Sequence, residues 1–215
     1  MGSATKSDLD AVTLAELLCA RLCHDLSGAV GATAAGAELL LDGGGGDAET
    51  AALVAASAAG GAARLRLLRA AFGPAVSPQS VAALRALAEA HLASQASAAP
   101  LEMRWNGLPA TLEGPLARLL LNLVLLGRDA LPRGGRVEIG LSAGAWPEMV
   151  LNGEPASLAD DVRAALLSDE AAASPRAAQA RFTRLLARLL DARIVVGTTA
   201  RGLRVAVEPG TETPV

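Results

Sequence analysis

Apolar residues recur at helical spacing from Thr13 to Leu41, and this pattern limits how the N-terminal part of the chain can fold. Residues three and four positions apart lie on one face of an α-helix, so the run predicts a long amphipathic helix. A second helical run, Ala48 to Phe72, is rich in alanine, the best helix former. The glycines from Gly43 to Gly46 predict a short turn between the runs. Residues 13–72 are therefore expected to form an antiparallel helical hairpin.

The ends and the free face of this hairpin support further predictions. Thr13 is followed three residues later by Glu16, a spacing typical of a capping box, so residues 1–12 are expected to be disordered. The pair Gly60-Gly61 is expected to kink or loosen the second helix. A two-helix hairpin leaves half of its apolar stripe facing water. A second copy would cover that stripe, so the sequence predicts a homodimer with a four-helix bundle.

The rest of the chain mixes helical and strand patterns. Residues 73–80, rich in proline and glycine, are expected to be a linker, and residues 208–215 a tail. Residues 81–207 predict an α+β sandwich with helices on one face of a sheet. The expected helices are Val81–Ala93, Gly114–Leu131, Leu158–Leu167 and Ala177–Leu190, and the expected strands are Leu101–Trp105, Arg136–Ser142, Glu148–Leu151, Arg193–Val196 and Leu203–Val207.

Charge and hydropathy exclude several classes of partner. A formal net charge of −3 gives no sign of the clustered Lys and Arg that bind a phosphate backbone, so nucleic acid is not an expected ligand. The longest apolar stretch, Leu116–Leu126, is shorter than the ~18–20 residues of a bilayer span and contains Arg118 and Asn122. Residues 1–10 lack the features of a signal peptide. We therefore expect a cytoplasmic protein that is not bound to a membrane.

The cysteines of the chain, Cys19 and Cys23, lie one helical turn apart. This spacing fits reduced thiols that pack within a cytosolic protein. A metal site made of both cysteines and His24 is disfavoured, because no further ligand lies nearby to complete the coordination shell. No metal and no cofactor is expected to bind to this chain.

The chain has two histidines, and only one of them lies in an unusual setting. His91 is expected to be a surface residue at a helix end. At about 100° per residue His24 lies about 200° from Leu22, so it is expected to face solvent. Gly inside a helix costs about 1 kcal/mol relative to Ala, so a face of small residues indicates a partner that docks closely. A solvated helix face normally carries Lys, Glu and Arg. On this face the neighbours of His24 are Leu17, Ala20, Gly28 and Gly31. The alternative is that a composition rich in Gly and Ala placed them there.

An exposed imidazole in this setting suits phosphoryl transfer. A neutral imidazole is nucleophilic and can attack a phosphoryl group to form a labile phosphoramidate. Asp25 could hold or deprotonate the ring of His24, and Arg21 could pair with the phosphoryl charge. The alternative for these two residues is an ordinary solvated ion pair at helical spacing. Hydrolase chemistry is disfavoured, because no nucleophilic Ser or Cys is placed beside His24 apart from Cys23.

Two segments resemble parts of known signalling proteins. Residues 21–26 (RLCHDL), followed by residues 36–40 (GAELL), resemble the phospho-accepting helix of the ChpT-type histidine phosphotransferases of alphaproteobacteria. They are also similar to the His-Glu/Asp-Leu box of sensor histidine kinases, although Ala29 stands where those kinases usually carry a proline. Residues 122–135 (NLVLLGRDALPRGG) are similar to the ATP-binding segment of the same kinases. Together the matches, in this order, cover nearly the whole chain.

Three departures from the kinase pattern concern the nucleotide. The resemblance implies a Mg²⁺-binding Asn at the position of Leu126, and an aliphatic side chain cannot bind a hard cation. The kinase box Asp-x-Gly-x-Gly corresponds to residues 151–155 (LNGEP), which lack the Asp and the second Gly. The glycine-rich lid and the last phosphate loop are absent between Ala164 and Arg181. The resemblance therefore implies a histidine-kinase ATPase-like (Bergerat-type) α/β sandwich that does not bind nucleotide.

The resemblance to the ChpT-type family also implies a function and partners. It implies a homodimer that takes a phosphoryl group from the Asp of one receiver domain and passes it to another through His24, with Mg²⁺ supplied by the receiver. The implied donor is a receiver like that of the hybrid kinase CckA, and the implied acceptors are cell-cycle regulators like CtrA and CpdR. Two alternatives stay open: an adaptor that binds receivers without carrying phosphate, and an ATP-using histidine kinase.

Overall fold

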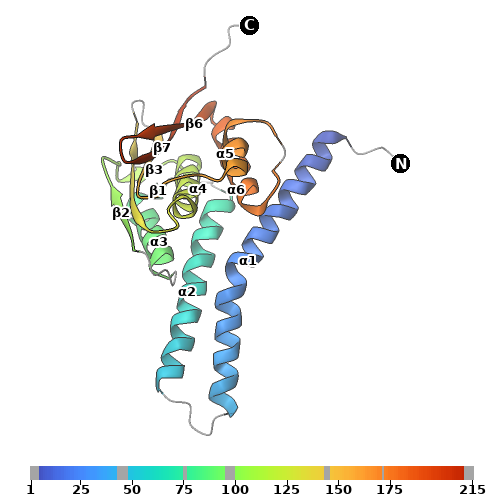
Figure 1. Cartoon of the computed structure of the whole chain (residues 1–215), viewed down its shortest axis with the longest axis vertical. Helices are drawn as coiled ribbons and strands as arrows, with labels where there is room; N and C mark the ends of the chain where they lie inside the picture. Colours follow the sequence, from blue (N-terminus) through green and yellow to red (C-terminus); the bar gives the residue numbers. More distant parts are fainter. Residues whose placement is uncertain are drawn as a thin grey trace.

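A helical hairpin stands against an α/β sandwich in the computed structural model (Figure 1), which describes residues 5–42, 48–74, 77–94, 100–142, 146–170 and 172–210. The elements are, in chain order, α1 (Lys6–Asp42), α2 (Ala48–Phe72), β1 (Gln79–Ser80), α3 (Val81–Ala93), β2 (Leu101–Trp105), β3 (Thr111–Leu112), α4 (Gly114–Ala130), β4 (Gly135–Leu141), β5 (Pro147–Asn152), α5 (Asp160–Leu167), α6 (Pro175–Arg188), β6 (Ala192–Thr199) and β7 (Gly202–Pro209).

The first helix begins earlier than the sequence predicts. The backbone N–H of Asp8 donates to Thr5 Oγ1 (3.2 Å), and the backbone N–H of Thr5 donates to the Asp8 carboxylate (2.9 Å). These reciprocal bonds form a capping box, so the box predicted at Thr13 and Glu16 and the disorder predicted up to residue 12 are wrong for residues 5–12. The second helix has its predicted bounds. The predicted turn from Gly43 to Gly46 lies outside the described residues.

The two helices of the hairpin pack closely along their length. A Cβ added at Gly61 would lie 3.1 Å from the Cβ of Ala29, so the absence of a side chain lets α2 approach α1. A Cβ at Gly36 would in turn press on Val54. Helix α2 continues through Gly60 and Gly61 without a break, so this pair serves helix packing at the place where the sequence suggests a kink.

Part of the apolar stripe of α1 is left uncovered. Helix α1 turns one side toward α2, and the adjacent side of the stripe faces outward. The exposed residues of this uncovered stripe are Val12, Cys19, Cys23, Val30 and Leu41. The prediction that Cys19 and Cys23 pack inside the molecule is therefore wrong for the single chain.

Among the described residues, α2 is the one helix long and apolar enough to cross a bilayer by length and composition. Core helices of soluble proteins share this property. One side of α2 packs on α1, and the buried residues Ala63, Leu67, Leu68 and Ala71 lie in its C-terminal half, where it contacts α3 and α4.

The sandwich has the predicted α+β architecture. Its five-stranded sheet has the order β2-β4-β5-β7-β6, in which β2 and β4 are parallel and the other pairs are antiparallel. One face is apolar and lies on the helices, whereas the other carries ion pairs such as Arg136 with Glu102 and Arg204 with Glu148. The sequence missed β1 and β3, which pair with each other, so the predicted linker includes a strand. The predicted tail begins too early, because β7 continues to Pro209.

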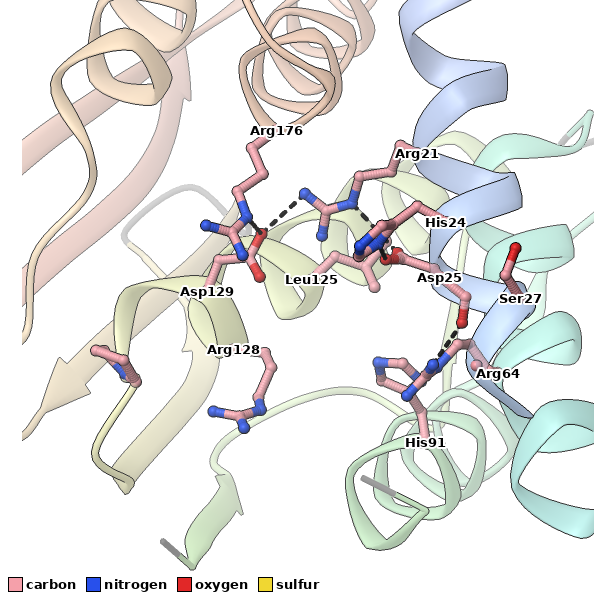
Figure 2. A pocket seen from close by; sticks show the side chains of 12 residues that line it. Arg21, His24, Asp25, Ser27, Arg64, His91, Leu125, Arg128, Asp129 and Arg176 are labelled. Carbon is pink, nitrogen blue, oxygen red and sulfur yellow. Dashed lines mark hydrogen bonds and ion pairs between the residues drawn. The ribbon is translucent and has the colours of Figure 1, made fainter. Parts of the chain in front are cut away.

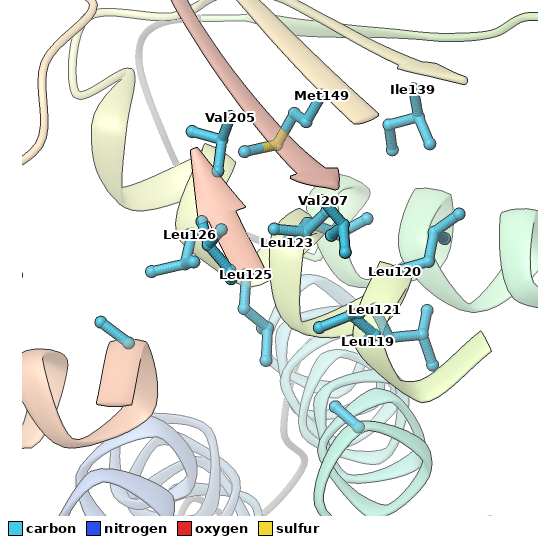
Figure 3. Close-up of a cluster of buried hydrophobic side chains, with 14 of the residues drawn as sticks. Leu119, Leu120, Leu121, Leu123, Leu125, Leu126, Ile139, Met149, Val205 and Val207 are labelled. Carbon is cyan, nitrogen blue, oxygen red and sulfur yellow. The ribbon is translucent and has the colours of Figure 1, made fainter. Parts of the chain in front are cut away.

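Helix α4 forms the centre of the core (Figure 3). Leucines and Val124 on several sides of α4 are buried against Ile139, Met149, Val205 and other residues of the sheet on one side and against helices on the other. Pro115 occupies the first turn, where its missing N–H costs no helical bond. A helix that is apolar on nearly all sides must be covered on all of them, which explains why α2 and α6 both contact it.

Polar side chains of α4 fasten the end of the hairpin to the sandwich. Asn122 is fully buried, and its Nδ2 donates to the carbonyl of Ala71 (2.8 Å). Arg118 donates to the carbonyl of Phe72 (3.1 Å) and stacks its guanidinium 5.0 Å from the ring centre of Phe182. These bonds satisfy carbonyl groups at the C-terminal end of α2, which have no partner within the helix. The hairpin is thus held by hydrogen bonds as well as by apolar packing.

Candidate functional site

His24 lies in the middle of α1 at the edge of a pocket of about 660 Å³ (Figure 2). Its side chain is 88% exposed, as the sequence predicts. Both parts of the molecule build this pocket: α1 and α2 of the hairpin form one wall, and helices of the sandwich form the other. The lining residues are Arg21, His24, Asp25, Ser27, Gly28, Arg64, His91, Leu125, Arg128, Asp129, Pro132 and Arg176.

The carboxylate of Asp25 lies beside the ring of His24, as expected. Oδ1 of Asp25 is 3.4 Å from Nδ1 of His24. In the tautomer that carries its proton on Nδ1, the ring donates to this oxygen and keeps a lone pair on Nε2. The pair therefore has the arrangement of a nucleophilic imidazole with a carboxylate partner.

The sequence places Arg21 near the face of His24, and the structure shows that it is buried there. It is 8% exposed, and its guanidinium contacts two carboxylates. Nε lies 3.2 Å from Oδ2 of Asp25, and Nη1 lies 2.8 Å from Oδ2 of Asp129. Because Asp129 belongs to α4, Arg21 joins the histidine helix to the sandwich.

The pocket as a whole is basic. Arg64 of α2 donates to the backbone carbonyl of Asp25, and Arg128 of α4 donates to the carbonyl of Leu131 (3.2 Å). Arg176, at the start of α6, is largely exposed with Nε 3.9 Å from Asp129. With Arg21, four arginines line the pocket, against the two carboxylates of Asp25 and Asp129. Such a pocket attracts an anionic group to the side of His24.

The small residues predicted as a docking face are accessible to different degrees. Gly28 lines the pocket. A Cβ added at Gly28 or at Gly31 would have no other atom within 4 Å. Ala20 is exposed and Leu17 is half-buried. The face beside His24 is therefore open in the single chain.

His91 is buried, so the prediction of a surface position is wrong. It is 4% exposed and lies below the pocket, because α3 turns this side toward α2. Burial, and to a smaller extent the nearby positive charge of Arg64, lower the pKa of His91 from 6.5 to about 4. The ring is consequently neutral in the folded protein near neutral pH.

Two positions in the segments that resemble the kinase nucleotide site serve the packing of this protein. Leu126 is buried in the core and offers no metal ligand. A Cβ at Gly153 would lie 2.8 Å from Leu131, so this glycine is needed for packing. Within the described part of the chain, no group of three His, Cys, Asp or Glu residues could hold a metal ion.

Comparison with known proteins identifies the family. The family model of the histidine phosphotransferase C-terminal domain matches residues 81–202, more than half of the chain. The chain belongs to the ChpT-type histidine phosphotransferases. The protein phosphotransferase ChpT of Brucella abortus (strain 2308) is 32% identical over 136 residues, which are 62% of this chain and 63% of that protein. The chain thus aligns with less than two thirds of the length of this relative.

One solved structure extends the likeness of the ChpT-type chain to its hairpin. A bacterial phosphotransferase solved at 1.7 Å is 29% identical, with a TM-score of 0.76 over 96% of this chain and 98% of its own. The Acinetobacter baumannii histidine kinase AdeS is 11% identical, with a TM-score of 0.48 over 88% of this chain and 98% of its own.

Sequence reasoning missed every pocket residue that lies outside α1. These residues are Arg64, His91, Leu125, Arg128, Asp129, Pro132 and Arg176. Arg128, Asp129 and Pro132 belong to the segment that resembles the kinase box, and this membership was the available signal. The spacing of apolar residues along one helix does not show which distant helix it will contact.

The buried neutral ring of His91 predicts an acid-sensitive fold. The pKa of His91 is lower in the folded protein than in the unfolded chain, so the unfolded chain takes up the proton first as the pH falls. The contribution of the neutral His91 ring to the free energy of unfolding is fully present above about pH 6.5. It decreases by about 3 kcal/mol as the pH falls toward 4. We expect His91→Gln to reduce this loss, measured as the free energy of urea unfolding at pH 7.5 and 4.5.

The matched control is His24→Gln, which replaces the exposed histidine. At equal protein concentration, the free energy of urea unfolding of this variant should depend on pH as that of the wild type does. An unchanged pH dependence in His91→Gln would contradict the prediction.

Proposed function

We propose that this protein is a cytoplasmic histidine phosphotransferase of a bacterial two-component phosphorelay. His24 takes a phosphoryl group from the Asp of one receiver domain and delivers it to the Asp of another. The observation that carries this proposal is an exposed imidazole with Nδ1 3.4 Å from a carboxylate, at the edge of a basic pocket. Membership in the ChpT-type family supports it.

The transfer follows from the arrangement of His24 and Asp25. Nε2 of His24 attacks the phosphorus of the aspartyl phosphate in line, and the N–P bond forms as the P–O bond to the receiver Asp breaks. The electron pair of that bond leaves with the receiver carboxylate. Asp25 accepts the hydrogen bond from Nδ1–H and stabilises the positive charge that develops on the ring. The reverse step phosphorylates the second receiver.

The charge of the pocket suits receiver domains as partners. An aspartyl phosphate and the carboxylates that hold its Mg²⁺ are anionic, and four arginines of this chain line the pocket. The Mg²⁺ comes with the receiver, and this chain binds no metal or other cofactor of its own. By the family resemblance, we propose a donor like the CckA receiver and acceptors like the cell-cycle regulators CtrA and CpdR.

The proposed reaction uses no ATP. The sandwich would be a Bergerat-type ATPase-like fold in which Leu126 replaces a metal ligand and residues 151–155 no longer form the adenine box. The phosphoryl group must then come from a receiver.

We further propose that the protein is a homodimer with a four-helix bundle. The uncovered stripe of α1 continues into an apolar groove between the hairpin helices, and a second copy of the hairpin would cover both. The groove is lined by Leu26, Ala29, Val30, Thr33, Ala34, Ala37, Ser57, Ala58, Gly61, Ala62 and Leu65. His24 lies on another side of α1 and would stay accessible in this dimer.

The proposed transfer predicts that label from a phosphorylated receiver moves to this protein and that His24→Ala abolishes the label. The phosphoramidate should be labile in acid and stable in base. The measurement is a gel assay with ³²P-labelled receiver and Mg²⁺. Labelled ATP in place of the receiver should give no label.

Two outcomes would contradict the proposal. Binding of receivers without any label on the wild type would favour the adaptor. Label from ATP would favour a kinase.

Because the face beside His24 is open, we expect a large side chain on this face to block the docking of a receiver domain. A Cβ added at Gly28 or Gly31 meets no atom within 4 Å in the single chain, so Gly28→Leu and Gly31→Leu should keep the fold. We expect receiver affinity and transfer rate to fall at least about tenfold, the loss that ~1.4 kcal/mol of steric conflict causes. Gly197→Leu in β6, where an added Cβ also meets no atom within 4 Å, is the control and should transfer normally. Normal transfer by the Gly28 and Gly31 variants would refute the docking face.

The dimer predicts a mass of twice 21.6 kDa in sedimentation equilibrium. Val30→Asp places a charge in the apolar groove, where it would be buried without a partner, so this variant should be monomeric at micromolar concentration. Leu189→Asp changes another exposed apolar residue, just after α6, and should remain dimeric. A monomeric wild type would overturn the dimer.

A further inference from the structure

A continuous chain of charged contacts connects the sandwich with His24. Asp129 of α4 contacts Nη1 of Arg21 (2.8 Å), Nε of Arg21 contacts Oδ2 of Asp25 (3.2 Å), and Oδ1 of Asp25 contacts Nδ1 of His24 (3.4 Å). Figure 2 shows these contacts as a line of side chains across the pocket. The two oxygens of Asp25 therefore have different partners.

Burial makes this chain of contacts specific. Arg21 is 8% exposed, and a guanidinium shielded from water interacts strongly with the charges beside it. Its fork of N–H groups can bind both oxygens of one carboxylate at once. Here the ion pair with Asp129 at Nη1 fixes the orientation of the guanidinium, and in that orientation Nε meets a single oxygen of Asp25.

We propose that Asp129 is a positioning residue for phosphotransfer: by holding one end of Arg21, it keeps Oδ1 of Asp25 available to Nδ1 of His24. Without the Asp129 charge, the guanidinium turns to bind both oxygens of Asp25, and the carboxylate no longer orients the ring. Asp129 contacts neither His24 nor the reacting atoms, so its effect passes through Arg21. This inference rests on the proposed function, and it assigns the kinase-like sandwich a use that needs no nucleotide.

The other charges around the pocket do not perform this task. Arg64 donates to the backbone carbonyl of Asp25 and leaves the carboxylate oxygens free. Arg128 donates to the carbonyl of Leu131 (3.2 Å), and Arg176 approaches Asp129 at 3.9 Å from the exposed side. The ring of His91 is neutral in the folded protein. In the described part of the chain, Asp25 and Asp129 are the carboxylates that contact Arg21.

The tautomer of His24 tests the inference directly. The chain contains two histidines, so a ¹⁵N spectrum of the imidazole rings at pH 8 has two sets of signals, and His24→Ala assigns them. In the wild type we expect the Nδ1–H tautomer of His24 to dominate. Asp129→Asn, which removes the charge and keeps the shape, should shift the ring toward the Nε2–H tautomer. The control is Glu148→Gln, because Glu148 also pairs with an arginine and its side chain is 25% exposed, against 23% for Asp129.

The transfer rate gives a second readout. Asp129→Asn should slow labelling of His24 by a phosphorylated receiver about tenfold, the lower end of the loss when a functional imidazole loses the group that orients it. In an Asp25→Asn background the same change should have no further effect, because the oriented carboxylate is already gone. Arg21→Lys, whose compact ammonium group lacks the rigid fork that spans Asp25 and Asp129, should shift the tautomer in the same direction.

The outcomes separate the inference from the proposed function. A His24 tautomer and labelling rate in Asp129→Asn equal to those of Glu148→Gln would overturn the role of Asp129. If Asp129→Asn does not fold, the tautomer in Arg21→Lys decides in its place, and no shift there overturns the inference. Absence of label on the wild type overturns the proposed function, while the ring spectra, which need no receiver, still test the role of Asp129.

Discussion

The burial of α4 on nearly all sides determines how the two parts of this molecule are joined. A helix that lies between a sheet and other helices must be apolar, and each polar exception needs a partner. The exceptions Arg118 and Asn122 bond to the last carbonyls of α2, and Asp129 pairs with Arg21 of α1. Each of them thus connects the core of the sandwich with the hairpin. The pocket beside His24 exists because these connections hold α1 against the sandwich.

Most of the fold could be predicted because it follows from local patterns. The bounds of α2, α3 and β2 agree with the periodicity of apolar residues and the glycines and prolines that flank them. The start of α1 was wrong because Thr5 and Asp8 offer a second capping box upstream of Thr13, and sequence alone does not rank the two. The two-residue strands β1 and β3 were missed because their pairing depends on a contact between distant segments.

The site could be predicted only in the part that lies on one helix. Helical geometry alone gives the exposure of His24 and its neighbour Asp25. The burial of Arg21 and His91 depends on which side of α1 and α3 meets another element, and this information is absent from the periodicity of either helix. The resemblance to a kinase box drew attention to the lost nucleotide ligand at Leu126, whereas three residues later the same helix supplies Asp129. The segment that resembles a kinase box thus also supplies the carboxylate that pairs with Arg21.

The connections through Arg118, Asn122 and Asp129 also have a thermodynamic consequence for a relay. A pocket assembled before any partner arrives offers the same geometry to every receiver and favours none of them by its own rearrangement. It lowers the barrier equally in both directions. In the proposed relay, the net flow of phosphoryl groups would then be set by the relative stabilities and concentrations of the phosphorylated receivers, so the direction of transfer would be decided outside this chain.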